Sequence, residues 1–162
     1  MASLLTLEIL SGYTRPVFSL RDNITCLIDS GADTPVWTQG AERLMDVFQV
    51  EKVEGKKFLL SGFGVGYEIV DVYNVKDLAL CGEGENVIFK SITVACTSRP
   101  TMVADIILPN TAFNHMNLTL RNLDVDYPVV EIEHQKKDYF VNPIFSAMDE
   151  AFVERVYSFT NG

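Results

Sequence analysis

The chain has 162 residues, of which 48% are hydrophobic and 22% are charged, and its formal net charge at pH 7 is −9. These values are typical of a single globular domain with a core of its own. With only 13 lysine and arginine residues the chain is poorly supplied for binding phosphate groups, so we expect no nucleic-acid partner. No apolar run approaches the roughly 20 residues of a membrane-spanning helix, so we expect no membrane association.

The first ten residues and the cysteines predict a cellular location. The opening stretch, MASLLTLEIL, has no basic residue ahead of its apolar run and carries Glu8 within it, which argues against a secretory signal. The three cysteines, Cys26, Cys81 and Cys96, are an odd number and lack the short spacing of a zinc site. We therefore expect a reduced, cytoplasmic protein with no metal and no cofactor.

Short runs rich in β-branched and aromatic residues, separated by turn formers, occupy most of the chain. They predict strands over residues 4–9, 17–20, 25–28, 86–96, 105–108, 118–120 and 129–132. Apolar residues at helical spacing predict helices over residues 41–48 and 143–157, and Pro109 is placed to open a short helix over residues 109–116. The expected fold class is therefore mainly β with two or three helices.

Residues 57–75, KFLLSGFGVGYEIVDVYNV, predict a hairpin with a glycine-rich tip. Two apolar arms flank Gly62, Gly64 and Gly66, which allow a tight turn. A phosphate-binding loop has a similar glycine spacing. That loop leads into a helix, however, whereas these glycines lead into a β-prone run.

The segment Cys26–Asp33, CLIDSGAD, is the candidate catalytic segment. It places a carboxylate, Asp29, at the end of an apolar run, where a charge is costly unless it is paired or hydrogen-bonded. Two such carboxylates about 3 Å apart share one proton, so one can activate a water while the other polarises a peptide carbonyl. Asp-Ser-Gly is also a common turn sequence, so the tripeptide alone leaves both interpretations open.

The string LIDSGAD, residues 27–33, resembles the active-site signature of the retropepsin-like aspartic proteases, which is apolar-apolar-Asp-(Thr/Ser)-Gly-Ala with a further Asp. The similarity continues in order over about residues 3–122. The glycine-rich hairpin resembles the flap of the family, ADIILPN (residues 104–110) its second hydrophobic turn, and NLTLR (residues 117–121) its closing strand. The chain departs from the family at Leu108-Pro109, where the family usually has glycine, and in its continuation past Asn122.

The resemblance implies a retropepsin-like barrel subunit over residues 1–122, with a C-terminal extension over residues 123–162 that contains a helix and packs on or beside it. Asp29 would be the catalytic residue. The substrate-binding residues would be Ser30, Gly31, Ala32, Asp33, Phe63, Gly64 and Val65. Ser30 would also join hydrogen bonds at the base of the dyad. Because only one Asp-(Ser/Thr)-Gly occurs, the resemblance implies a homodimer that cleaves a peptide or protein substrate without metal or cofactor.

Two alternatives remain open for the whole chain. The same fold could bind extended peptides without cutting them, through strand addition under the hairpin. It could also serve in assembly, with the acidic extension as the interaction surface. Among single residues, Trp37 is either core or the wall of a substrate pocket. The residues expected to be structural are Cys26, His115, Tyr139, Phe140 and Phe145.

Overall fold

The computed structural model describes residues 2–11, 17–21, 24–60, 67–97, 104–122, 126–135, 138–142 and 149–161. The strands are β1 (Ser3–Ser11), β2 (Val17–Arg21), β3 (Ile24–Ile28), β4 (Val36–Trp37), β5 (Gln49–Leu60), β6 (Glu68–Leu80), β7 (Glu83–Gly84), β8 (Val87–Cys96), β9 (Ile106–Leu108), β10 (Asn117–Arg121), β11 (Val129–His134) and β12 (Tyr139–Val141). The helices are α1 (Ala41–Val47), the short 3-10 helix η1 (Asn110–Phe113) and α2 (Glu150–Asn161).

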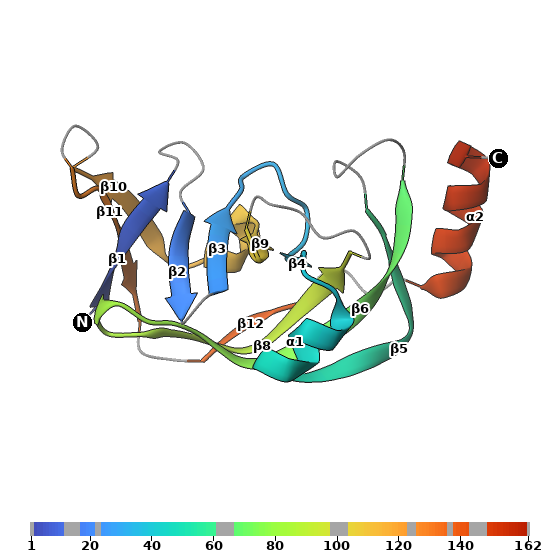
Figure 1. Cartoon of the computed structure of the whole chain (residues 1–162), viewed down its shortest axis with the longest axis horizontal. Coiled ribbons are helices and arrows are strands. Elements are labelled where there is room, and N and C mark those ends of the chain that lie inside the picture. The colour runs from blue at the N-terminus through green and yellow to red at the C-terminus, as the bar shows by residue number, and fades with distance from the viewer. Residues whose placement is uncertain are drawn as a thin grey trace.

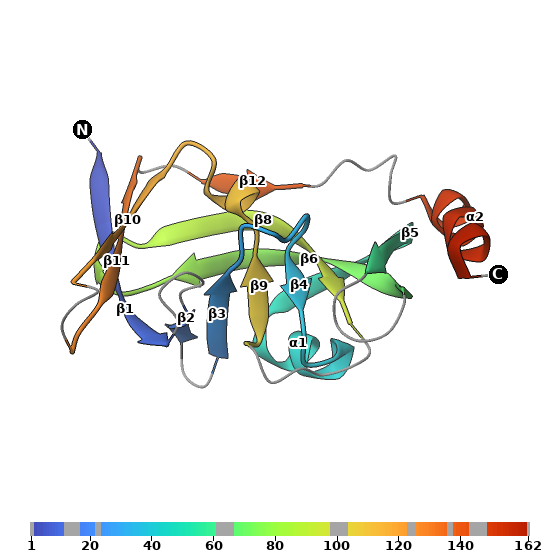
Figure 2. The ribbon, with the colours of Figure 1, turned by 90° about the horizontal axis from the view of Figure 1, so that it is seen from above.

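The strands form one mixed sheet with the order β10-β11-β1-β2-β3-β9-β4-β8-β6-β5, while β12 pairs with β8 and β7 with β1 beside this path (Figure 1). Seen from above, β3, β9 and β4 lie side by side, with β8 and β6 beyond them (Figure 2). The mainly β class is therefore confirmed. Pairing among the described residues runs as an open sheet, and the retropepsin-like barrel is not confirmed.

The strands at the centre of the sheet are buried on both faces. Alternate side chains of a strand point to opposite faces, and in β3 Ile28 joins the larger apolar cluster while Leu27 joins a smaller one. In β9, Ile106 likewise joins the larger cluster and Ile107 the smaller one. The smaller cluster consists of Leu27, Val36, Leu60, Val70, Ala95, Ala104 and Ile107, with Val17, Ala32 and Phe58 packed against it.

The structure confirms a strand at each place where the sequence predicts one, and it adds three short strands. β4, β7 and β12 have only two or three residues each, too few to show any periodicity. β7 lies in the stretch GEGE (residues 82–85), whose two glycines favour a turn rather than a strand. The charged first half of β5, which has no regular alternation, is also a strand because it pairs with β6.

The helices differ from the predictions at their ends. α1 is confirmed, and the helix expected after Pro109 is a single 3-10 turn. α2 begins at Glu150, later than predicted, because the Asp149 carboxylate accepts the amide hydrogen bond of Ala151 at 3.0 Å and so caps the helix. Residues 143–148 lie outside the described residues. None of the helices that the structure describes has the length and apolar character required to cross a membrane.

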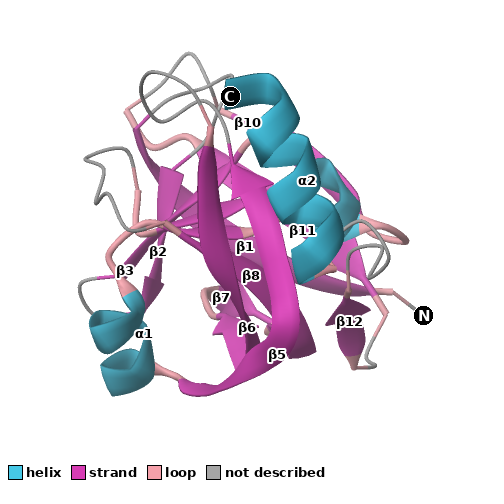
Figure 3. Cartoon of the chain, turned by 90° about the vertical axis from the view of Figure 1, so that its right-hand side faces the viewer, coloured by secondary structure: helices cyan, strands magenta, loops and turns pink. Residues whose placement is uncertain are grey.

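The C-terminal extension contributes two strands to the sheet. β11 lies between β10 and β1 and pairs antiparallel with both. β12 pairs in parallel with β8. α2 follows and lies against the long arms β5 and β6 (Figure 3), where its Val153 is only 2% exposed. The first strand of the extension therefore has hydrogen-bonded neighbours on both edges.

Candidate active site

Asp29 directly follows β3, and its main chain is held by the neighbouring strand. β3 and β9 run in parallel with Ile28 paired to Leu108. The Asp29 amide continues this ladder by donating a hydrogen bond to the Leu108 carbonyl at 2.9 Å. The chain therefore leaves the sheet at Asp29, and the hydrogen bond to β9 fixes the position of the Asp29 main chain.

The segment after β3 forms the turn that the sequence Asp-Ser-Gly allows. The Ala32 amide donates to the Asp29 carbonyl at 3.1 Å, and the Gly31 amide donates to the Asp29 Oδ1 atom at 2.9 Å. A Cβ atom added to Gly31 would lie 3.3 Å from that same oxygen, which is a tight contact. The turn thus holds the Asp29 carboxylate against residue 31, and a glycine there leaves it the room it needs.

The predicted site residues of this turn differ in exposure. Asp29 and Ala32 are half-buried, whereas Ser30, Gly31 and Asp33 are exposed. Ala32 also packs against the smaller apolar cluster. The turn therefore presents a hydroxyl and a second carboxylate to solvent on either side of a glycine, next to an apolar surface.

A polar network joins the three strands around the site at the end opposite Asp29. The Asp105 carboxylate accepts a hydrogen bond from the Thr25 amide at 2.9 Å, and the Asp105 amide donates to the Thr25 hydroxyl at 3.2 Å. Thr38, after β4, donates its amide to the Asp105 carbonyl at 2.9 Å and its hydroxyl to the Ala104 carbonyl at 2.5 Å. These bonds tie β3, β9 and β4 together.

Sequence reasoning missed this network, although a signal for it exists. The stretches TCLID (residues 25–29) and DIILP (residues 105–109) each place a polar residue before three apolar ones. If the two apolar runs pair in parallel, Thr25 and Asp105 fall side by side. The observed register, with Cys26 opposite Ile106, places them in this way.

The β5–β6 hairpin reaches the face of the sheet beside Asp29. Its last described pair is Leu60 with Glu68. Leu60 and Val70, from the two arms, belong to the same apolar cluster as Leu27, two residues before Asp29. The tip, residues 61–66, lies outside the described residues, and with it the predicted site residues Phe63, Gly64 and Val65.

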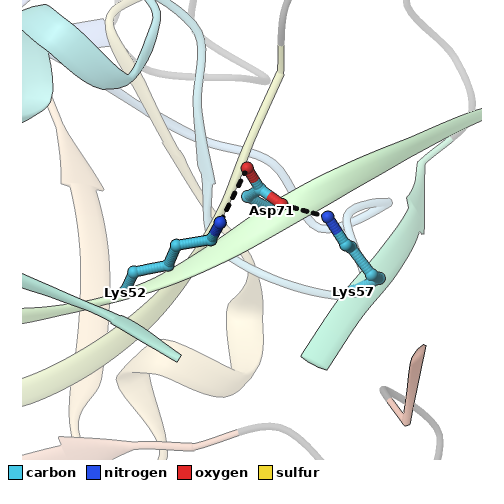
Figure 4. A network of polar contacts seen from close by, with 3 residues as sticks. All are labelled: Lys52, Lys57 and Asp71. Carbon is cyan, nitrogen blue, oxygen red and sulfur yellow. Dashed lines mark hydrogen bonds and ion pairs between the residues drawn. The ribbon is translucent and has the colours of Figure 1, made fainter. Parts of the chain in front are cut away.

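An ion-pair cluster braces the arms of this hairpin (Figure 4). The Asp71 carboxylate on β6 accepts a hydrogen bond from the Lys57 ammonium on β5, and the Lys52 ammonium lies 3.7 Å from its other oxygen. The hydrogen bond with Lys57 lowers the pKa of the Asp71 carboxyl, and the same bond raises the pKa of the Lys57 ammonium. The two lysines flank an irregularity in which the register shifts between Lys52 and Lys57, with Gly55 at φ +75°.

Trp37 and the buried cysteines belong to the core. Trp37 is fully buried, and its indole N–H donates to the Gly40 carbonyl at 2.7 Å, so the core interpretation of this residue is confirmed. Cys26 is buried as expected, and burial raises the pKa of its thiol. Burial also raises the pKa of the Cys96 thiol to about 11. Neither thiol is therefore suited to act as a nucleophile near neutral pH.

The other residues that were expected to be structural differ in their burial. Tyr139 is buried, and its ring packs near Phe89 with 6.3 Å between ring centroids. Phe140 is 63% exposed, so the expectation that it packs in the core is wrong. In β12 the two side chains point to opposite faces, and only one face is covered. His115 is exposed at φ +68°, and Phe145 lies outside the described residues.

Within the described ranges, no three His, Cys, Asp or Glu side chains are grouped as a metal site requires. Comparison of the chain with protein-family models, with curated proteins and with solved structures finds no match. Any function must therefore be argued from the residues and their geometry.

Proposed function

We propose that this protein is an aspartic endopeptidase of the retropepsin-like kind, active as a homodimer in which each chain supplies one Asp29 to a shared dyad. The observation that carries the proposal is the position of Asp29. It lies at the end of a strand buried on both faces, its amide is bonded to Leu108, and its carboxylate is held by its own turn. A carboxylate held in this way can be placed reproducibly beside its symmetry mate.

The proposed chemistry uses two Asp29 side chains and one water. Two carboxylates near 3 Å cannot both be ionised, so they share a single proton. The ionised one removes a proton from the water, which attacks the peptide carbonyl carbon, while the protonated one donates a hydrogen bond to the carbonyl oxygen. The proton then passes to the departing amine, and both carboxylates return to their starting state.

The surroundings of Asp29 fit an extended peptide as substrate. The arms of the hairpin share an apolar cluster with the strand that carries Asp29, as a lid over a peptide would. Ser30, Gly31 and Asp33 are exposed at the same turn, within reach of a peptide main chain, and Ala32 packs against the apolar cluster. By the family resemblance, Phe63, Gly64 and Val65 would complete the lid.

The test is incubation of the purified protein with a digest of unrelated proteins, with and without a statine peptide that mimics the tetrahedral intermediate. New termini that appear only without the inhibitor would support the proposal.

The pH dependence of the rate is a second test. On a single peptide, kcat/KM should fall on both the acid and the alkaline side of an optimum, because the singly protonated dyad is the active species. A rate that rises steadily to pH 9 would rule out the dyad.

The second candidate is a peptide-binding or assembly module that does not cut. It is favoured by one observation: Leu108, fully buried, and Pro109 occupy the position next to Asp29 where the family pattern has glycine. A bulky pair there could hold the two Asp29 carboxylates further apart than the chemistry allows. Peptide binding that survives the Asp29→Asn substitution, together with no cleavage by the wild type, would favour this candidate.

A further inference from the structure

The outer half of the β5–β6 hairpin is a ribbon of only two strands. Residues 57–60 of β5 pair with residues 68–71 of β6, whereas the pairing of β6 with β8 begins at Asp71. The described part of the chain has no strand beside residues 68–70 on that side. A two-stranded ribbon is at best marginally stable by itself. Its position therefore depends on what packs against its two faces.

The two faces of this ribbon have different neighbours. Because side chains alternate along a strand, Leu60 and Val70 point to one face, which belongs to the smaller apolar cluster. That cluster also contains Leu27 of β3. Leu59 and Ile69 point to the other face and are half-buried. The hairpin lies between β3 and α2 in two perpendicular views (Figures 1 and 2), so α2 covers this second face.

α2 is attached to the ribbon beside an irregularity of β5. Its Val153 is only 2% exposed, and the helix lies against β5 and β6. Asp149, directly before the helix, forms an antiparallel bridge with Lys56. Lys56 follows Gly55, which has φ +75° and lies where the register of the hairpin shifts. The attachment is therefore at the point where the ribbon leaves the regular part of the hairpin.

The charges of α2 also favour this position. The pKa of the Lys57 ammonium is raised most by its hydrogen bond with Asp71, and the negative charges of Glu150 and Glu154 on α2 raise it further. Lys57 belongs to the ribbon, and alternation places it on the same face as Leu59. Acidic groups of the helix thus attract the face of the ribbon that the helix covers.

We propose that α2 is a clamp that holds the ribbon against β3, the strand that leads to Asp29, and that release of α2 lets the ribbon move about Gly55. In the released state the ribbon has cover on one face only. The consequence for catalysis rests on the proposed function. A peptide under the hairpin is then held less tightly, so KM rises, while kcat is retained because the turn at Asp29 is carried by other strands.

Hydrogen exchange tests the clamp without any measurement of activity. Val153→Asp buries an unpaired charge between α2 and the ribbon, which is costly, so the helix should detach. The amides of residues 57–60 and 68–71 should then exchange about tenfold faster or more, while those of β3 keep the wild-type rate. Phe152→Asp, the same change at a neighbour that is 45% exposed, should leave all these rates unchanged. Equal exchange in the two variants would overturn the proposal.

A reversible cross-link tests the same contact in the opposite direction and decides the question if Val153→Asp does not fold. Lys56→Cys with Asp149→Cys, in a Cys81→Ser background, places two thiols across the observed bridge. Opposed Cα atoms there lie about 4.5–5.5 Å apart, within the span of a disulfide. Oxidation should slow exchange of the ribbon amides about tenfold relative to the reduced form of the same variant. Unchanged exchange on oxidation would overturn the clamp.

Peptide kinetics on the same variants test the regulatory role. Val153→Asp should raise KM about fivefold or more with kcat near wild type, and Phe152→Asp should change neither. An unchanged KM in a variant whose ribbon exchanges faster would overturn the regulation of the site by α2. If the wild type cleaves no peptide while exchange responds as expected, the proposed function fails and the clamp is supported.

Discussion

The Oδ1 atom of Asp29 lies 2.9 Å from the amide nitrogen of Gly31, so the carboxylate accepts a hydrogen bond from its own turn. The two residues therefore constrain each other: the amide orients the carboxylate, and the carboxylate leaves little room for a side chain at residue 31. The proposed chemistry depends on this orientation, and the first two predictions address it.

Asp29→Asn should abolish cleavage and leave folding and dimer formation near wild type. The amide has nearly the shape of the carboxylate and its oxygen can still accept the Gly31 hydrogen bond, but it cannot remove a proton from water. The measurements are peptide turnover and the denaturation midpoint. Asp46→Asn, an exposed change on α1, is the matched control and should keep full activity. Turnover by Asp29→Asn at the wild-type rate would disprove the assignment of Asp29.

Gly31→Ala should lower activity and leave stability nearly unchanged, whereas Gly40→Ala should lower stability and leave activity nearly unchanged. The first adds a Cβ 3.3 Å from Asp29 Oδ1, which shifts the carboxylate by tenths of an ångström, so activity should fall with little loss of stability. The second has open space around it but lies at φ +88° and ψ 156°, a region that only glycine adopts readily, so it should lower the free energy of unfolding by about 1–3 kcal/mol through backbone strain, with activity retained. Activity and thermal unfolding measured on both variants check the pair. If Gly31→Ala were fully active, the position of the carboxylate would not limit the rate.

Asp105→Ala should destabilise the fold by about 1–3 kcal/mol, because it leaves the Thr25 amide without its acceptor in a partly buried site. The loss should appear as faster hydrogen exchange at the amides of β3, including that of Asp29, which is bonded to β9. Asp46→Ala, exposed on α1, serves as the control and should change stability by less than about 0.5 kcal/mol. Unchanged exchange in β3 would mean that the network does not hold the strands together.

Asp71→Asn should reduce stability in a pH-dependent way. The folded-state pKa of the Asp71 carboxyl lies below its ordinary value of 3.8, so its ion pair stabilises the fold above about pH 4 and loses this contribution as the pH falls further. On the alkaline side, the ion pair loses its contribution to stability as the pH rises through the pKa of the Lys57 ammonium, which lies above its ordinary value of 10.5. Because Asp71 is 35% exposed, solvent screening limits the effect to about 0.2–1 kcal/mol.

Urea denaturation of the wild type and of Asp71→Asn at pH 7 and pH 3 measures this effect. The difference between the two proteins should be present at pH 7 and smaller at pH 3, and it should shrink at high salt. Asp77→Asn, which removes a more exposed pair with Lys90, is the control and should change stability less at pH 7 than Asp71→Asn does. An equal difference at both pH values would contradict the assigned role of the carboxylate.

Much of the secondary structure can be read from the sequence because it follows from local patterns. The apolar runs of β3 and β9, the two apolar arms of the hairpin and the helical spacing of α1 each lie within one segment, so they are visible without knowledge of a partner. The turn at Asp29 is of the same kind, since Asp, Ser and Gly each favour a turn by their own chemistry. The position of the candidate site was therefore predictable.

Other features depend on partners far along the chain, and only the tertiary structure decided them. β4, β7 and β12 are too short to carry a pattern, and they are strands only because β8, β9 and β1 offer unpaired main-chain groups beside them. The contact between Thr25 and Asp105 joins residues 80 positions apart. The exposure of Phe140 was likewise settled by which face of β12 the rest of the chain covers. The physical reason is common to all three: a hydrogen bond or a buried face needs a neighbour, and the fold determines which neighbour is present.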